Sequence, residues 1–168
     1  AQKAQIPIWG ELEVASWFCQ SPIVAVTGSN GKSTVTQWIG EVFTKSGIPT
    51  LVAGNIGNAF SEWVEKTTPE GVVVLEVSSF QLETIETFHP FIVVFLNLSQ
   101  DHLNRHGTLE NYGRMKARIF ENQTEKEYAV LNGEDESVRF LTQSIRAKKV
   151  FFGHSACGEQ CGFVREGK

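Results

Sequence analysis

The sequence lacks the features of secreted, membrane-spanning and nucleic-acid-binding proteins. Its three cysteines, at positions 19, 157 and 161, are too few and too irregularly spaced for a disulfide framework. No apolar run approaches the roughly 20 residues needed to span a bilayer. No signal peptide is visible, because the first 20 residues are mixed and carry Glu11 and Glu13. A net charge of −4 argues against a nucleic-acid surface.

Methionine is almost absent, which bears on how much of a protein this chain represents. The only methionine is Met115, and the chain begins with Ala1. Residues 158–168 are rich in glycine and charge and resemble a cut more than a packed terminus. We therefore expect a piece of a larger protein, with a linker and a first helix in residues 1–21 and one truncated domain in residues 22–168. With 168 residues, the chain can still bury a core of its own.

Runs of apolar, β-branched residues alternate with helical patterns along the chain. Strands are predicted at residues 22–27, 50–53, 72–77, 91–96, 128–131 and 149–152, and helices at 11–20, 32–46, 59–66, 109–122 and 135–145. The helix 11–20 should bury Leu12, Val14, Ala15 and Phe18. Several strands are apolar on both faces, which is typical of a parallel sheet covered on two sides. The sequence predicts an open, doubly wound, mostly parallel α/β sheet, with ligands beyond the carboxyl ends of its strands.

A glycine-rich turn between a predicted strand and a predicted helix is the strongest functional signal. It reads Thr27-Gly28-Ser29-Asn30-Gly31-Lys32-Ser33-Thr34. In such turns the backbone N–H groups point at a phosphate, and the helix dipole favours its negative charge. Lys32 would add a positive charge beside the β- and γ-phosphates, and the Ser33 hydroxyl lies where a Mg²⁺ ligand is expected. The alternative is a structural turn, since Val26 stands where the standard spacing has its first glycine.

Polar residues at strand ends are the next candidates. Burying the carboxylate of Glu76 on an apolar strand costs several kcal/mol unless it is paired or metal-bound, so Glu76 is a candidate Mg²⁺ ligand. The alternative is a structural glutamate. His102, in the polar run 97–106, could bind a second cation or touch a substrate, or be a surface histidine. Asn55 could reach a ligand from a turn, or be an ordinary turn residue.

Four stretches together resemble the ATP-dependent Mur ligases. They are the phosphate loop, the turn 54–57, the segment 75–83 and the segment 97–106, which match the family in order and spacing over residues 8 to about 152. The resemblance implies the family's central ATP-binding domain, with the N-terminal UDP-binding domain and the C-terminal domain absent from this chain. Phe80-Gln81-Leu82 favours the branch that adds D-glutamate to UDP-N-acetylmuramoyl-L-alanine through an acyl phosphate, in peptidoglycan synthesis.

The resemblance also implies roles in ATP and metal binding. Residues 28–34 would bind ATP, with Lys32 on its β- and γ-phosphates. Two Mg²⁺ ions are implied, the first bound by Ser33 and Glu76 and the second by His102. Lys116 matches a lysine that is carbamylated in the family and so becomes an anionic oxygen ligand. From the residues alone, Lys116 reads as part of a solvated helix face.

By resemblance, Asn55, Ser78 and Gln81 would lie near the muramoyl substrate. One competing interpretation is a free-standing nucleotide-binding module, and another is a folylpolyglutamate-synthase-like ligase, against which Phe80-Gln81-Leu82 argues. An ATP motif with few cysteines indicates a reducing, cytoplasmic setting. As the ATP-binding part alone, the chain should be inactive by itself.

Overall fold

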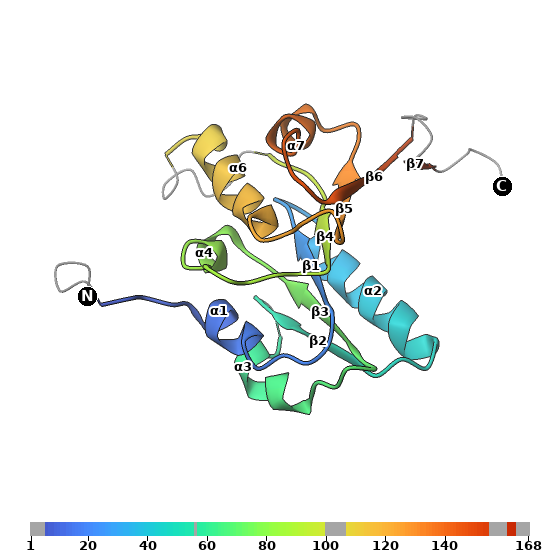
Figure 1. The fold of residues 1–168 in the computed structure, drawn as a ribbon. Helices are drawn as coiled ribbons and strands as arrows, with labels where there is room; N and C mark the ends of the chain where they lie inside the picture. The colour runs from blue at the N-terminus through green and yellow to red at the C-terminus, as the bar shows by residue number, and fades with distance from the viewer. Residues whose placement is uncertain (1–5, 56, 100–106, 155–160, 164–168) are drawn as a thin grey trace.

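The structure, a computed structural model, contains one parallel sheet in the order β2-β3-β1-β4-β5-β6-β7 (Figure 1). It describes residues 6–55, 57–99, 107–154 and 161–163, the last range in backbone only. The strands are β1 (Ile23–Thr27), β2 (Thr50–Gly54), β3 (Val72–Glu76), β4 (Ile92–Phe95), β5 (Tyr128–Asn132), β6 (Lys148–Gly153) and β7 (Cys161–Phe163). Every paired strand in the described ranges is parallel. The predicted fold class is therefore confirmed, and the six predicted strands end within one residue of the observed ones.

The helices agree less closely with the prediction. They are α1 (Glu11–Ser16), α2 (Lys32–Lys45), α3 (Phe60–Trp63), α4 (Ser79–Leu82), α6 (Leu109–Ala117) and α7 (Glu136–Leu141), with 3-10 turns η2 (Val64–Lys66) and η3 (Arg118–Phe120). The predicted helices 59–66 and 109–122 each divide into an α-helix and a 3-10 turn. Neither α4 nor β7 was predicted, because four and three residues are too few to show a hydrophobic period.

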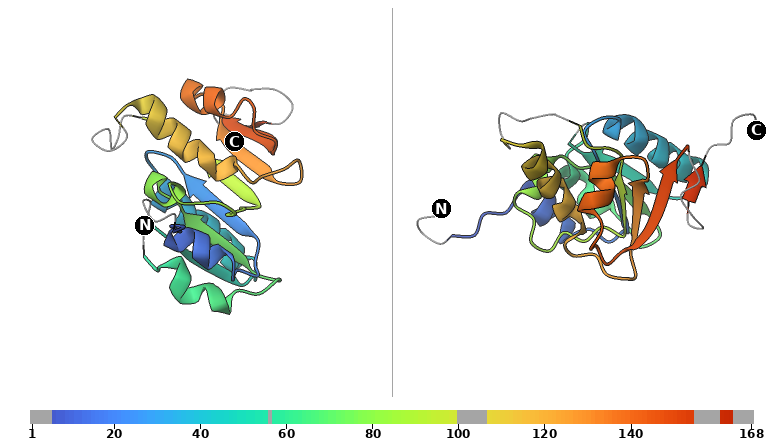
Figure 2. Two further views of the ribbon diagram at one scale, coloured as in Figure 1. Left: turned by 60° about the vertical axis from the view of Figure 1, so that its left-hand side comes forward. Right: turned by 90° about the horizontal axis from the view of Figure 1, so that it is seen from above.

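The two faces of the sheet carry separate hydrophobic cores. One core is covered by α1, α3, α4, α6 and α7, and within the described residues the other is covered by α2 (Figure 2). Val35, Ile39 and Phe43 of α2 pack on that second face. Beside them lies an apolar groove of about 450 Å³, lined by Val24, Val35, Ile39, Phe43, Ile92, Val94, Leu96, Val130 and Phe152. Helices thus lie on both faces, as a doubly wound sheet requires.

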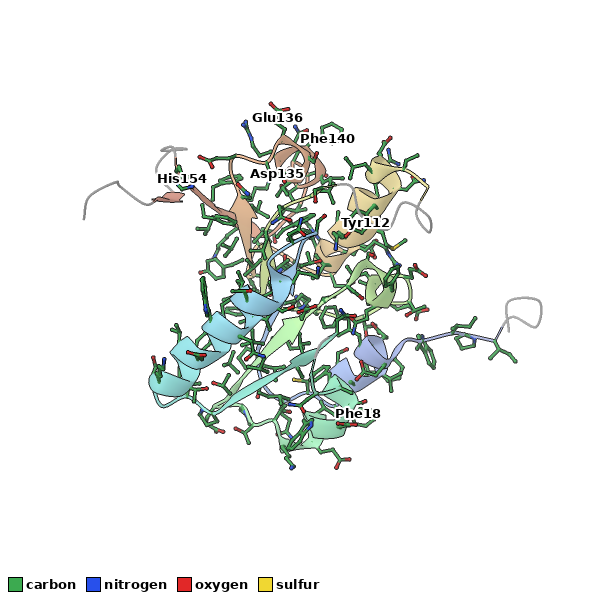
Figure 3. All side chains as sticks on the ribbon, turned by 180° about the vertical axis from the view of Figure 1, so that it is seen from behind. Phe18, Tyr112, Asp135, Glu136, Phe140 and His154 are labelled. Carbon is green, nitrogen blue, oxygen red and sulfur yellow. The ribbon has the colours of Figure 1, made fainter. Side chains whose placement is uncertain are left out.

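The first helix corrects one expectation. It ends at Ser16 instead of residue 20, and two residues predicted to be buried, Val14 and Phe18, are exposed. Figure 3 labels Phe18. Glu13 is buried in their place, beside Leu12 and Ala15. The physical reason is that the Glu13 carboxylate accepts hydrogen bonds from the backbone of residues 86–88, which draws this face of α1 inward.

Strand register brings the predicted site to one edge of the sheet. β1 lies between β3 and β4, with Val26 opposite Glu76 and Thr27 opposite Phe95. Gly54 at the end of β2 is also opposite Glu76. The carboxyl ends of β1 to β4 therefore lie side by side, which is where ligands bind in such sheets. None of the helices in the described ranges is long and apolar enough to cross a bilayer.

Candidate functional site

The phosphate loop leaves the end of β1 through a close approach to the end of β4. Gly28 has φ +151°, and a Cβ built on it would lie 3.1 Å from the Leu96 Cβ and 3.3 Å from the Asn97 nitrogen. Gly31 has φ +81° directly before the first residue of α2. Both positions suit glycine for a structural reason. At Gly28 the close approach of the residues that follow β4 leaves no room for a larger side chain.

Side chains after β4 fix the conformation of the phosphate loop. The Asn30 backbone N–H donates to Asn97 Oδ1 at 2.9 Å, and Asn97 Nδ2 donates back to the Asn30 carbonyl at 3.0 Å. Ser29 Oγ donates to the Ser99 carbonyl at 3.1 Å and accepts from the Ser99 N–H at 2.9 Å. Neither Asn97 nor Ser99 was among the predicted site residues. The signal was present, because both belong to the polar run that follows a buried strand.

The start of α2 presents backbone donors next to the loop that lack partners among the described residues. The N–H groups of the first helical turn, residues 32–34, have no partner within a helix, and the helix dipole places positive charge there. Lys32 Nζ donates to the Ser29 carbonyl at 3.0 Å, so its ammonium is held over the loop. Ser33 is half-buried and Thr34 is exposed. This arrangement suits an anion with several oxygens, such as a phosphate chain.

Glu76 ends β3 beside the loop and is incompletely paired. The residue is only 2% exposed, and its Oε1 accepts a hydrogen bond from Asn55 Nδ2 at 3.2 Å. The Asn55 N–H also donates to the Glu76 carbonyl at 2.9 Å. Its other carboxylate oxygen, Oε2, is buried and has no hydrogen-bond partner among the described residues. A buried carboxylate oxygen without a donor is costly, and it is the type of ligand that a hard divalent cation prefers.

The donor set at this edge fits Mg²⁺. Within the described ranges, no three His, Cys, Asp or Glu side chains gather as a dedicated metal cluster. Magnesium does not require one, because it is commonly held by one or two carboxylates together with phosphate oxygens and water. Glu76, at the end of β3, and the Ser33 hydroxyl, at the start of α2, are groups of the kind that could hold such an ion. His102 lies outside the described residues.

Lys116 is buried, which corrects the solvated-face interpretation. It lies on α6, which packs against α4 and α7, and only 1% of its surface is exposed. Its Nζ lies 4.7 Å from the ring centroid of Tyr112 on the same helix. The packing of α6 turns this side chain inward, a tertiary effect that the pattern of basic residues along the helix does not reveal.

Ser78 and Gln81 bond to each other in this structure. Ser78 Oγ donates to Gln81 Oε1 at 3.1 Å, and the Ser78 N–H donates to the same oxygen at 3.0 Å. Together they form a capping box at the start of α4. The preceding carbonyl, of Val77, accepts from Thr27 Oγ1 at 3.0 Å, which ties this cap to the strand that leads into the phosphate loop. The structure thus brings Ser78 close to the loop, whereas Asn55 reaches the same edge through Glu76.

Comparison with known proteins agrees with this arrangement. Residues 26–161 match the Mur ligase middle domain. UDP-N-acetylmuramoylalanine--D-glutamate ligase of Pelotomaculum thermopropionicum is 51% identical over 90% of this chain and 33% of its own length. The enzyme of that name from Alkaliphilus oremlandii is 47% identical over 97% of this chain and 36% of its own length. The chain therefore spans about a third of the length of these curated relatives.

Solved structures share the fold. MurF ligase from Thermotoga maritima in complex with ADP superposes with a TM-score of 0.69 at 24% identity, over 87% of this chain and 36% of that one. FolC of E. coli in complex with ADP gives a TM-score of 0.62 at 17% identity, over 89% of this chain and 49% of that one. Fold, phosphate loop and sequence agree, and the chain belongs to the Mur ligase family, with residues 26–161 corresponding to its middle domain.

Proposed function

We propose that this chain is the ATP-binding part of a ligase that joins D-glutamate to UDP-N-acetylmuramoyl-L-alanine. Two relatives that carry this activity in their names are 51% and 47% identical to it. The observation that carries the proposal is the juxtaposition of a phosphate loop with the buried, unpartnered Oε2 of Glu76. Because the chain spans about a third of these relatives, the other contacts to ATP, D-glutamate and the UDP end would come from further domains of the same protein.

The proposed reaction proceeds through an acyl phosphate. A carboxylate oxygen of the alanyl group attacks the γ-phosphorus of ATP, the bond to the bridging oxygen breaks, and ADP leaves. The D-glutamate amine then attacks the acyl carbon, phosphate leaves, and the amine loses a proton to solvent. In such a reaction the protein mainly positions the reactants and neutralises charge on phosphoryl oxygens.

The phosphate loop would bind the ATP phosphates. The N–H groups of residues 28–34 would cradle them, with Lys32 beside the β- and γ-phosphates. The position of Lys32 Nζ over the loop, bonded to the Ser29 carbonyl, supports this role. Ser33 and Glu76 would hold a first Mg²⁺. Such an ion would supply positive charge beside the phosphate oxygens that these residues face.

A second Mg²⁺ would be held by His102 and by Lys116 in carbamylated form. Carbamylation joins the lysine amine to CO₂ with release of a proton, so that a cation becomes an anionic oxygen ligand. Lys116 is buried, which supports a role other than that of a solvent-exposed surface lysine. Asn55, Ser78 and Gln81 would lie near the muramoyl substrate. Ser78 and Gln81 would then exchange part of their mutual hydrogen bonding for bonds to that substrate.

We further propose that residues 22–168 belong to the middle domain, that residues 1–21 lead into it, and that the enzyme works in the cytoplasm. A folylpolyglutamate-synthase-like activity has weaker support, because FolC is similar in fold at only 17% identity. A nucleotide-binding module without ligase activity would share the phosphate loop, so only turnover distinguishes it.

The test is turnover by the full-length parent protein. ADP formation should require both UDP-N-acetylmuramoyl-L-alanine and D-glutamate, and hydroxylamine in place of D-glutamate should trap the acyl phosphate as a hydroxamate. Stimulation by a folate substrate and L-glutamate would instead favour the sister activity. Nucleotide binding without ADP formation under any of these conditions would contradict the ligase proposal and favour a binding module.

A further inference from the structure

The segment that runs from the last residue of α4 towards β4, residues 82–90, is held by side chains from elsewhere in the chain. It has no regular secondary structure after Leu82, so its backbone polar groups need other partners. Arg118 and Asn122 bind its carbonyl groups, and Glu13 of α1 accepts hydrogen bonds from its N–H groups. We call these three side chains the clamp.

Arg118 uses every donor that a guanidinium has. Its Nη1 donates to the carbonyls of Leu82 at 2.7 Å and Glu83 at 2.9 Å, and its Nη2 donates to that of Ile85 at 2.9 Å. Its Nε and Nη2 donate to the two carboxylate oxygens of Glu121 at 2.9 and 3.2 Å. All five N–H groups are thus occupied. A lysine has three donors around one nitrogen and cannot reproduce this planar fork.

The position of Arg118 connects two parts of the candidate site. Arg118 begins η3 and lies two residues after the buried Lys116. The carbonyls that it binds belong to the last residue of α4 and the residues that follow. A helix of four residues has little stability of its own, because helix nucleation is costly. The capping box of Ser78 and Gln81 fixes the start of α4, and Arg118 fixes its end.

Different side chains hold the two parts of the candidate site, the phosphate loop and the region around α4. Asn97 and Ser99 fix the phosphate loop, and neither is bonded to the clamp in the described structure. Glu13 and Asn122 bind residues 86–88, beyond α4. Arg118 is therefore the member of the clamp that bears directly on α4 and on the segment carrying Lys116.

We infer that Arg118 is a positioning residue for the acceptor substrate. It keeps α4, and with it Ser78 and Gln81, aligned with the helix that carries Lys116. This inference rests on the proposed function, in which these residues face the muramoyl substrate. Because Arg118 touches neither the phosphate loop nor its anchors, its loss should affect the acceptor side and spare ATP.

Steady-state kinetics of the full-length enzyme test this separation. Arg118→Lys keeps the charge and loses the fork, so we expect the KM for UDP-N-acetylmuramoyl-L-alanine to rise about tenfold while that for ATP changes less than about twofold. Glu121→Gln leaves the carbonyl contacts but weakens the orientation of Arg118, and an increase of about threefold is expected. Arg114→Lys, on the exposed face of α6 in an ion pair with Glu110, should change neither KM.

Each outcome decides the inference. Equal increases in both KM values, or no increase in either, for Arg118→Lys would overturn it. If that variant does not fold, Glu121→Gln decides in the same way. Absence of ligase activity in the wild-type enzyme would overturn the proposed function instead. In that case amide hydrogen exchange still tests the positioning: Arg118→Lys should accelerate exchange in residues 79–85 and not in 28–34, and unchanged exchange in 79–85 would refute it.

Discussion

The phosphate loop and the clamp differ in whether their polar groups have hydrogen-bond partners within the protein. In the clamp, side chains meet the backbone donors and acceptors of an irregular segment, and Arg118 has no donor to spare. At the phosphate loop, the first N–H groups of α2 and Glu76 Oε2 lack protein partners within the described structure. Satisfied polar groups stabilise the fold, and we propose that the unsatisfied ones at the loop bind a ligand.

Glu13 shows the satisfied case most clearly. Its carboxylate accepts from the N–H groups of Glu86, Thr87 and Phe88 at 2.8–3.0 Å and from Trp17 Nε1 at 3.0 Å. Burial alone would raise the pKa of Glu13, but the bonds from Thr87, the Glu86 backbone and Trp17 outweigh it and lower the pKa. Glu76 is just as buried but has one unpaired oxygen. The same residue type thus serves stability in one place and, by our proposal, metal binding in the other.

The largest effect should come from removing the positively charged lysine side chain at the phosphate loop. In the full-length enzyme, Lys32→Ala should reduce acyl-phosphate formation by a factor of about 10³, because charge on the phosphoryl oxygens is no longer neutralised. The hydroxamate assay measures it. Lys45→Ala, at the exposed far end of the same helix, is the matched control and should retain full activity. A Lys32 variant with wild-type turnover would remove the loop from the proposed mechanism.

The next largest effect should be on the free energy of unfolding, through the clamp. Glu13→Gln replaces a carboxylate oxygen with an NH₂ group that faces N–H donors, so we expect the free energy of unfolding to fall by about 3 kcal/mol. Urea unfolding followed by circular dichroism measures the change. Glu41→Gln, in an exposed pair with Lys45, should cost less than about 0.5 kcal/mol. Equal costs for the two variants would mean that the clamp adds nothing beyond an ordinary surface glutamate.

A smaller effect on the free energy of unfolding should appear at low pH. Hydrogen bonds from the Thr124 backbone N–H and hydroxyl, and the neighbouring His89, lower the pKa of Glu127 to about 2, below its ordinary value of 4.5. A carboxyl group with a lowered folded pKa stabilises the fold above its unfolded pKa and loses that contribution as pH falls. The stabilisation should therefore be complete above about pH 4.5 and disappear towards pH 2. Glu13 has a shift of the same sign.

Substitution separates these contributions from those of other carboxylates. Glu127→Gln and Glu13→Gln should each flatten the decrease in unfolding free energy below pH 4.5, whereas Glu70→Gln, at an exposed position, should leave the profile unchanged. Urea unfolding at a series of pH values provides the measurement. If the free energy of unfolding of Glu127→Gln falls with decreasing pH as it does in the wild type, the hydrogen bonds to Thr124 do not persist in solution.

The two regions also differ in how far sequence predicts them. The positions of the phosphate loop and of Glu76 at strand ends could be predicted because their signals are local: a glycine turn between strand and helix, and one carboxylate on an apolar strand. The clamp could not, because Glu13 binds residues 73 to 75 positions away and Arg118 binds residues 33 to 36 positions away. Lys116 belongs with the clamp in this respect, since its burial depends on how α6 packs.

The helices illustrate the same limit on the scale of whole elements. Strand ends were predicted within one residue, because runs of buried β-branched residues have sharp boundaries. The predicted apolar side of α1 was partly wrong. The hydrophobic period of a helix cannot show that one of its carboxylates accepts hydrogen bonds from a distant part of the chain. α4 escaped prediction because a capping box and a distant arginine, not a hydrophobic period, define it. Prediction failed where structure depends on partners far apart in the chain.

The smallest effect on the free protein, and the sharpest contrast with Glu13, should come from Glu76→Gln. The chemical change is the same, but here it removes a buried carboxylate whose Oε2 lacks a partner, so the free energy of unfolding without ligands should stay within about 0.5 kcal/mol of wild type or rise. Thermal unfolding with and without Mg²⁺ and ADP completes the comparison, because stabilisation by Mg²⁺ with ADP should be reduced in the variant. A loss of stability as large as that of Glu13→Gln, with the ligand effect intact, would instead make Glu76 a structural glutamate. The unpaired oxygen would then mark an ordinary feature of the fold and not a metal site.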